Sequence, residues 1–214
     1  MHTLARSPVR EAGLKFKADT RAFTLIELLT VIGIIAILAG ITFGVVKGVQ
    51  ERAAIGQAKV ELAVLAQALE AYKLQYGDYP QIGRYTTATA PTAASNSNQP
   101  GLLFNALMGK LGPINNTFNN TLGKAFVEPS KLSTINADYP AASGNTLVAN
   151  AFIDPWGRAY LYSYRTSATG GGGWLKPSYY LYSVGPTNNH DAPDATGTVN
   201  YETANNADNL YAKR

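Results

Sequence analysis

The chain has no cysteine in its 214 residues and only two histidines, His2 and His190. Without cysteine it cannot form a disulfide framework, a thiolate metal site or a cysteine nucleophile. The sequence patterns of a nucleophile elbow, a Walker phosphate loop and an HExxH zinc helix are also missing. We therefore expect no enzymatic activity, and we interpret His190, which stands in a polar stretch, as a surface residue.

Excess positive charge lies mostly in the first 22 residues. The chain carries 18 Lys and Arg against 14 Asp and Glu; residues 1–22 hold five of these bases and two of the acids, which leaves 13 against 12. A nucleic-acid-binding domain needs basic side chains clustered on its folded part, and no such cluster is visible. We therefore expect no nucleic-acid partner.

Charge is absent from residues 28–46, and proline is absent from residues 23–76. A helix over residues 23–46 would extend roughly 36 Å, enough to cross a hydrocarbon core of about 30 Å. The basic residues that precede the run predict a cytoplasmic N-terminus and export of the remainder. A secretory signal peptide, the alternative, would have a shorter apolar region followed by a small-residue cleavage site.

An amphipathic helix continues directly out of the apolar run. Apolar residues recur there at spacings of three and four, which places them on one helix face: Ile55, Ala58, Leu62, Leu65, Leu69, Tyr72 and Tyr76. The polar residues off this stripe are expected to stay in water: Gln57, Lys59, Glu61, Gln67, Glu70 and Lys73. Gly77 suits a left-handed helix cap, and Pro80 cannot continue the helix.

Gly40, Gly44 and Gly48 recur every four residues at the junction between the two halves of this helix. Small residues at this spacing allow another helix to approach closely. Each glycine also lowers helix propensity by about 1 kcal/mol, which favours a flexible junction. Both interpretations stay open.

Glu27 is an isolated acid at the start of the apolar run. Its spacing from Thr24 predicts a capping box, in which each side chain bonds to the other residue's backbone. An ionisable group within a membrane segment is costly unless it is paired, and it usually marks function. If the chain were cut just before Phe23, the new α-amino group would supply a cation at the right depth. Both roles stay open.

The stretch RAFTLIELLTVIGIIAIL, residues 21–38, resembles the processing and methylation signature of type IV prepilins and pseudopilins. The resemblance implies that a prepilin peptidase cuts between Ala22 and Phe23 and methylates the new terminus at Phe23. It also implies that Glu27 and Thr24 act in assembly, in which Glu27 pairs with the Phe23 amine of an adjacent subunit. The chain departs from the family at Ala22, where glycine is usual, and at residue 44, where many relatives have proline.

Four further stretches resemble the major pseudopilins of type II secretion: residues 58–80, 99–107, 154–164 and 179–186. This resemblance implies a single-pass inner-membrane subunit that polymerises into a periplasmic pseudopilus and drives protein secretion. The implied partners are further copies of the chain, the prepilin peptidase, an inner-membrane assembly platform, minor pseudopilins, and membrane lipid before assembly. Two alternatives remain: a subunit of a surface type IV pilus for adhesion, motility or DNA uptake, and a membrane-anchored glycan-binding domain that does not polymerise.

Two tyrosine-rich runs, residues 159–164 and 178–184, have the length and composition of strands. Residues 170–173 are four glycines that would connect an antiparallel pair, and residues 154–157 predict a turn. We expect the six tyrosines of these runs to pack against the helix stripe, with a carbohydrate-binding face as the alternative. The predicted fold class is α+β, a long N-terminal helix packed on a small antiparallel sheet.

The predicted organisation has five parts. A cleaved basic leader covers residues 1–22, a membrane and assembly helix 23–48, and the amphipathic half of that helix 49–80. Residues 81–153 form a variable region, longer than its counterpart in type II pseudopilins, with a short buried helix near residues 101–111 and a surface loop at 115–121. The last part, residues 154–214, holds the sheet and an acidic loop.

The acidic loop carries the candidate metal chemistry. No Lys or Arg occurs between Pro177 and Ala212, whereas several carboxylates do. Oxygen ligands in a loop rich in Gly and Asn suit Ca²⁺. Resemblance to the major pseudopilins implies a calcium site here, with Asp191, Asp194 and Asp208 as candidate ligands. A solvated acidic loop without metal is the alternative.

Overall fold

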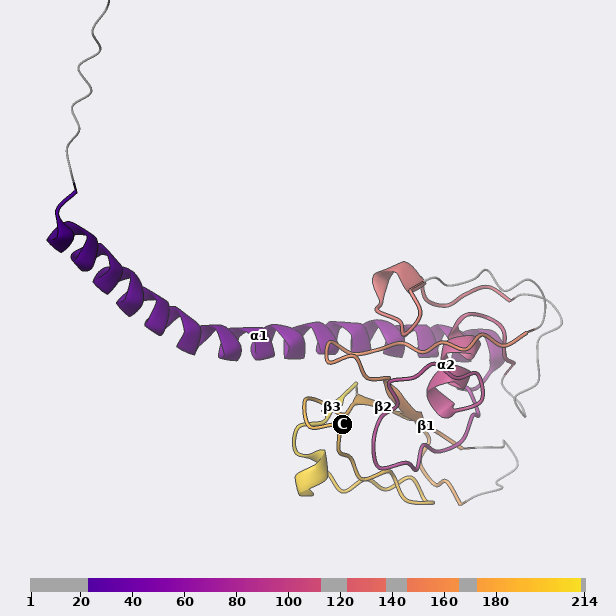
Figure 1. Ribbon diagram of the computed structural model, residues 1–214. Helices are drawn as coiled ribbons and strands as arrows, with labels where there is room; N and C mark the ends of the chain where they lie inside the picture. The colour runs from indigo at the N-terminus through magenta and orange to yellow at the C-terminus, as the bar shows by residue number, and fades with distance from the viewer. Residues whose placement is uncertain (1–22, 113–122, 138–145, 166–172, 213–214) are drawn as a thin grey trace, which may run out of the picture. The chain divides into compact units, whose positions relative to one another are not determined.

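A computed structural model describes residues 23–112, 123–137, 146–165 and 173–212, apart from the side chains of residues 42–47 and 129. The predicted leader 1–22, the loop at 115–121 and most of the glycine run at 170–173 lie outside the described residues. The chain divides into two units, Met1–Lys47 and Gly48–Arg214, which are considered separately. Figure 1 shows the order of the elements along the chain.

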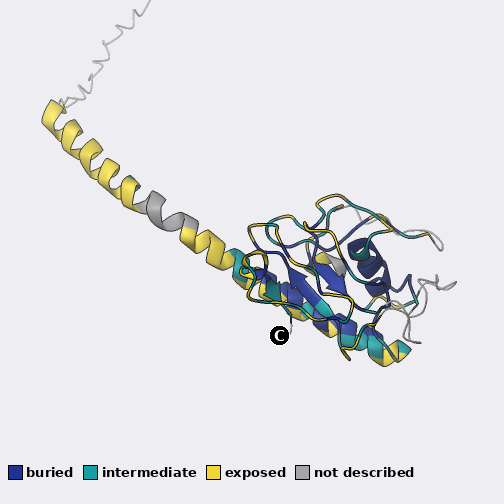
Figure 2. Cartoon of the chain, turned by 90° about the horizontal axis from the view of Figure 1, so that it is seen from below, coloured by how far each residue is buried: buried dark blue, intermediate teal, exposed yellow. Residues whose placement is uncertain are grey.

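Helix α1 spans Leu25–Tyr76, as the uninterrupted absence of proline predicts. In the first unit, the large apolar side chains of its described part are exposed, and Figure 2 colours these residues yellow. Over the part of the chain that the structure describes, no helix is long and apolar enough to cross a membrane.

In the second unit, α1 buries the predicted stripe. Ala58, Leu62, Leu65, Leu69 and Tyr72 are 0–1% exposed, whereas Ile55 and Tyr76 at the ends of the stripe are half-buried. The helix ends as predicted: the Gly77 N–H donates to the Lys73 carbonyl oxygen at 2.7 Å, and Gly77 has φ 85°. A left-handed conformation of this kind favours glycine.

The prediction that Glu61 stays in water is wrong. Its side chain is 6% exposed because the Tyr160 hydroxyl donates to it from a segment 99 residues further along the chain, at 2.6 Å. A periodic pattern on one helix cannot reveal a partner that only tertiary folding brings to it.

Helix α2 spans Gln99–Leu107, so the short helix predicted near residues 101–111 begins and ends earlier than expected. Asn98 caps it, because its side-chain oxygen accepts from the Gly101 N–H at 2.9 Å. Gly109 has φ 74° and lies against Gly123, which explains why the helix does not continue to residue 111. The eight residues from Pro100 to Leu107 are all buried.

Three short antiparallel strands form one sheet in the order β1-β2-β3. They are β1 Leu161–Ser163, β2 Tyr180–Ser183 and β3 Leu210–Tyr211. The register pairs Tyr162 with Leu181 in β1–β2, and Ser183 with Leu210 in β2–β3. The α+β fold class is confirmed, although the two predicted strands are shorter than expected and β3 is not predicted.

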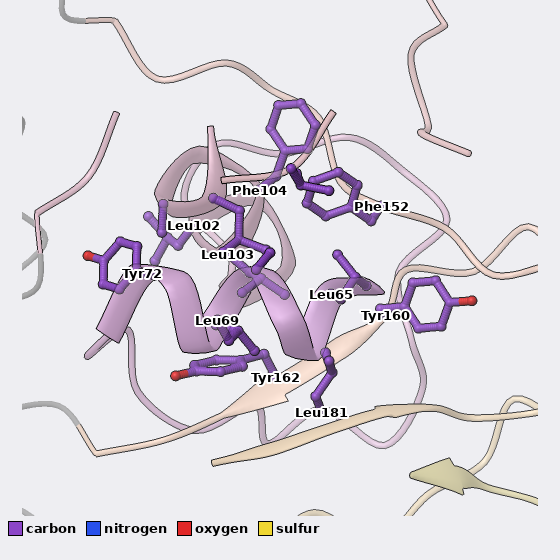
Figure 3. Packing of buried hydrophobic residues seen from close by; sticks show 14 of the residues in the cluster. Leu65, Leu69, Tyr72, Leu102, Leu103, Phe104, Phe152, Tyr160, Tyr162 and Leu181 are labelled. Carbon is purple, nitrogen blue, oxygen red and sulfur yellow. The ribbon is translucent and has the colours of Figure 1, made fainter. Parts of the chain in front are cut away.

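Side chains from α1, α2, β1 and β2 converge on the main core, as Figure 3 shows. Successive strand residues point to opposite faces, so Tyr162 and Leu181 enter this core while Leu161 and Tyr182 enter a second cluster. Four of the six strand tyrosines lie in the main core as predicted: Tyr160, Tyr162, Tyr164 and Tyr179. For the other two the prediction is wrong, because Tyr182 packs in the second cluster and Tyr180 is only partly buried beside it.

Two 3-10 turns complete the described fold. They are η1 Pro129–Lys131 and η2 Ala204–Asn206. The predicted turn before the first strand is present, because the Gly157 N–H donates to the Asp154 carbonyl oxygen at 2.9 Å. Residues 184–209 connect β2 to β3 with η2 as their regular element.

Candidate functional site

Thr24 and Glu27 form a capping box at the start of α1. The Thr24 N–H and hydroxyl donate to Glu27 Oε2 at 2.9 and 2.7 Å, and the Glu27 N–H donates to Thr24 Oγ1 at 3.3 Å. The Thr24 carbonyl oxygen also accepts from the Leu28 N–H. These bonds satisfy backbone groups that have no partner within the helix, which is what the capping interpretation predicts.

The capping box leaves the carboxylate of Glu27 without a compensating positive charge within the described residues. Among the described residues the ion pairs are Lys131–Glu128 and Arg165–Asp78, and both lie in the second unit. Phe23, next to the box, is 78% exposed. Ala22, on the other side of the predicted cleavage bond, lies outside the described residues. Pairing between Glu27 and a neighbouring amine stays a prediction.

Asp78 organises the other end of α1. It accepts from the Tyr164 hydroxyl at 2.9 Å and the Gln81 amide at 2.6 Å, and it pairs with Arg165. Burial alone would raise the pKa of Asp78, but the hydrogen bonds from Arg165, Gln81, Tyr79 and Tyr164 together hold it below its usual value. This acid therefore joins the helix end to the residues that follow β1.

Asp154 fixes the turn before β1 and joins it to β2. One carboxylate oxygen accepts from the Trp156 and Arg158 N–H groups, and the other accepts from the Ser183 hydroxyl at 2.6 Å. Burial raises the pKa of Asp154 despite these bonds. The geometry makes Asp154 a structural acid that joins the turn before β1 to the end of β2.

The three predicted calcium ligands are held in separate hydrogen-bond groups. Asp191 Oδ1 accepts from the Asn205 amide at 2.9 Å. Asp194 Oδ1 accepts from the Thr196 and Thr198 N–H groups, which closes a local turn. Asp208 accepts from Thr187 through both carboxylate oxygens, at 3.1 and 3.2 Å.

This donor set does not fit a calcium centre. Calcium takes six to eight oxygen ligands around one point. Within the described ranges, no group of three or more His, Cys, Asp or Glu side chains is placed to hold a metal. One carboxylate oxygen of Asp191 and one of Asp194 accept hydrogen bonds from amide, hydroxyl or backbone donors, and both carboxylate oxygens of Asp208 do so. Binding of calcium to this chain stays untested.

His190 is not the surface residue that its polar neighbourhood predicts. It is 2% exposed, its Nδ1 lies 2.9 Å from the Tyr182 hydroxyl, and its ring packs edge-on against Tyr182. Burial lowers the pKa of His190. Its ring therefore packs beside two residues of the second core cluster, Tyr85 and Tyr182.

The residues that sequence reasoning missed in this loop are asparagines. Asn206 and Asn209 are 0% and 3% exposed, and both lie within a hydrogen-bond network of the segment between β2 and β3. Asparagine is usually a surface or turn residue, so composition alone suggests an exposed loop. The one signal available is the high frequency of asparagine between residues 188 and 209.

Comparison with known proteins confirms the resemblance that the sequence predicts. Residues 17–43 match the prokaryotic N-terminal methylation motif. The chain is 33% identical over 88 residues to the type II secretion system core protein G of Escherichia coli (strain K12). That alignment covers 39% of this chain and 61% of the relative, so the chain spans less than two thirds of the length of this curated relative. No solved structure matches the chain.

Proposed function

We propose that this pilin-like chain is the structural subunit of a type II secretion-like pseudopilus. In this proposal the chain inserts in the inner membrane, is cut between Ala22 and Phe23, and is methylated at Phe23. It then polymerises into a periplasmic filament whose extension drives protein secretion. The role is mechanical and needs no catalytic residue.

The observation that carries the proposal is the N-terminal motif at residues 17–43, placed at the start of a long helix with exposed apolar side chains. An isolated chain with such a surface would be poorly soluble in water, because this apolar area would stay hydrated. Burial in lipid and then between neighbouring helices would remove that penalty. The similarity to core protein G favours secretion over other uses of pilin-like filaments.

Glu27 would supply the specificity of assembly. Its carboxylate lies on a helix of apolar side chains, where burial of a charge in the filament requires a partner of opposite charge. Cleavage before Phe23 creates such a partner, an α-amino group, on each subunit. A pair formed between the Glu27 of one copy and the Phe23 amine of another would fix the axial position of each added subunit.

A surface type IV pilus is the second candidate. Between α1 and β1 the chain has a long connection that contributes α2 and a substantial part of the core. The matched stretch covers 39% of the chain, so the similarity leaves most of this chain unaccounted for. Residues outside the match could decorate the outside of a surface fibre.

The test is to isolate filaments from gently lysed cells of the native host and to compare wild-type cells with the Glu27→Ala variant. We expect the wild type to yield filaments of this chain, and the variant to accumulate as a membrane-bound monomer, because the charged partner of the Phe23 amine is gone. Ile26→Ala serves as the matched control. Ile26 precedes Glu27 and is also exposed, so this variant shortens an exposed side chain at the same place without removing a charge.

Two outcomes would contradict parts of the proposal. Filament yield from Glu27→Ala equal to that of wild type would reduce Glu27 to a capping residue. Absence of filaments from wild-type cells that secrete normally would favour a membrane-anchored domain that does not polymerise. Filaments that extend outside intact cells at natural expression levels would favour the surface pilus.

A further inference from the structure

The segment between β2 and β3, residues 184–209, is long for a connection with little regular structure. Such a segment needs specific contacts, here called ties, to satisfy its backbone groups and stay ordered. It must nevertheless return to the sheet, because β3 pairs with β2 through Tyr211–Tyr182 and Leu210–Ser183. In its middle, the rings of His190 and Tyr201 pack against Tyr182 and Tyr211, while the carboxylates of Asp191, Asp194 and Glu202 are exposed. These two rings cover only part of the segment, and polar groups hold the rest of it.

Asn206 is the centre of these ties. Its Oδ1 accepts from the Asp191 N–H at 2.9 Å and from the Asn209 amide at 2.8 Å. Its Nδ2 donates to the Asn200 carbonyl oxygen at 2.6 Å and approaches the Asp191 carbonyl oxygen at 3.4 Å. The side chain is 0% exposed, and its two lone pairs and two hydrogens are all used.

A second tie closes the two ends of the segment. Thr187 donates its N–H and its hydroxyl to the two carboxylate oxygens of Asp208, 21 residues away. Gly185 makes this approach possible: it has φ 64°, and a Cβ there would lie 2.5 Å from the Asp208 carbonyl oxygen. A side chain at residue 185 would therefore push residue 208 away and separate the two ends of the segment.

A third tie joins the segment to the region after α1. Asn188 has φ 62°, a conformation that asparagine tolerates better than most residues, and its Oδ1 accepts from the Ala90 N–H at 3.0 Å. The Arg84 guanidinium donates to the Pro193 carbonyl oxygen at 2.8 Å. The segment is therefore tied at both ends, in its middle and to its neighbour.

We infer that residues 184–209 are held in place by an amide and hydroxyl network, with Asn206 at its centre and the Thr187–Asp208 pair at its ends, instead of by a calcium ion. Hydrogen-bond donors take the place of a cation: Thr187 satisfies the carboxylate oxygens of Asp208, and the Asn206 amide satisfies the carbonyl oxygens of Asp191 and Asn200. Because Thr187 already donates to both oxygens of Asp208, an ion at this position would have to displace those bonds. The segment then keeps its structure in the absence of divalent ions.

Hydrogen exchange of the full chain in detergent, resolved to peptides from residues 184–209, tests the inference. We expect the same protection in millimolar calcium and in excess EGTA. Asn206→Asp keeps the shape of the side chain but removes its two donors, so exchange in this segment should become faster, on the order of tenfold, in both solutions. Thr187→Val, at an exposed position, should speed exchange near residues 185–188 and 208 without unfolding the core.

Asn205→Ala is the matched control, since Asn205 is an exposed neighbour with a bond to the side chain of Asp191, and it should change exchange far less. Loss of wild-type protection in EGTA, or a melting temperature raised by calcium, would overturn the inference, because an ion that binds the folded state stabilises it. Wild-type protection in Asn206→Asp and Thr187→Val alike would overturn it too.

Discussion

At the scale of single residues, buried polar groups give the second unit its specificity. Glu61, Asp154 and Asn206 are 6%, 2% and 0% exposed, and each accepts hydrogen bonds from residues far away in the sequence. Removing one partner of such a bond leaves a buried group unsatisfied, which costs more than the bond contributes. These residues therefore fix how the segments meet, while apolar packing supplies most of the driving force.

The Tyr160–Glu61 bond gives the first prediction. Tyr160→Phe removes the donor 2.6 Å from Glu61 Oε2 and should lower the free energy of unfolding by about 1–3 kcal/mol. Thermal unfolding of the chain in detergent, followed by near-ultraviolet circular dichroism of the tyrosines, measures this change in stability. Tyr180→Phe removes a hydroxyl from a partly exposed ring and should cost less. If both variants melt alike, Glu61 does not depend on Tyr160.

Asp78 gives a prediction about pH. Its pKa is held below the usual value, so the folded state binds the proton more weakly than the unfolded state does. The stability that Asp78 contributes is therefore present above the pKa of an unfolded aspartate, about 3.9, and is lost as the pH falls through its lower folded value. Asp78→Asn should be less stable at pH 7 and should lose less stability between about pH 4 and 2. Equal acid dependence of the two melting temperatures would contradict the role of Asp78.

At the scale of elements, sequence patterns predict what depends on local periodicity. The stripe of α1, its end at Gly77 and the turn at residues 154–157 are confirmed because spacing and turn chemistry decide them. Strand β3, two residues long, has no local signal, since its pairing partner Ser183 lies 27 positions earlier. The burial of Glu61 and His190 is missed for the same reason, because Tyr160 and Tyr182 meet them only in the folded chain.

The candidate sites also differ in whether local spacing or long-range folding places their residues. Thr24 and Glu27 are three residues apart on one helix, so their capping geometry follows from the sequence. The placing of Asp191, Asp194 and Asp208 depends on how an irregular segment folds back on itself. Their acidic character suggests a shared ion, whereas the structure gives each its own donors among Asn205, Thr196 and Thr187.

The division of α1 between two units gives a prediction about that element. A fragment of residues 49–214 keeps the buried stripe and loses the exposed apolar residues 23–41. We expect a folded, soluble monomer by size-exclusion chromatography with light scattering, because the largest apolar surface is gone. The full chain, handled identically without detergent, should aggregate. Large oligomers of the fragment would mean that surfaces of the second unit drive association.

At the scale of the whole molecule, assembly would depend on the order of two events. Before cleavage, the Phe23 nitrogen belongs to a neutral peptide bond and cannot balance the charge of Glu27. After cleavage, it is a charged α-amino group that could pair with the Glu27 of another copy. Assembly of uncut subunits would place an unpaired charge between apolar helices, which is strongly disfavoured. Processing would therefore act as a switch that permits polymerisation, and Ala22, at a position where glycine is usual in the family that the chain resembles, would set its rate.

Processing gives the last prediction, and it concerns the whole chain in its host. Intact-mass analysis of the membrane fraction should show loss of residues 1–22 and one added methyl group, about 14 Da, on Phe23. Ala22→Gly should shorten the time that the uncut form persists after a pulse of synthesis, because glycine is the residue usually found before the cut. Ala22→Leu, which differs in side-chain size while keeping the site uncharged, should block cleavage and leave the uncut chain in the membrane without filaments. A mature terminus beyond residue 46, after the apolar run, would instead identify a secretory signal peptide and would remove the basis for both processing and filament assembly.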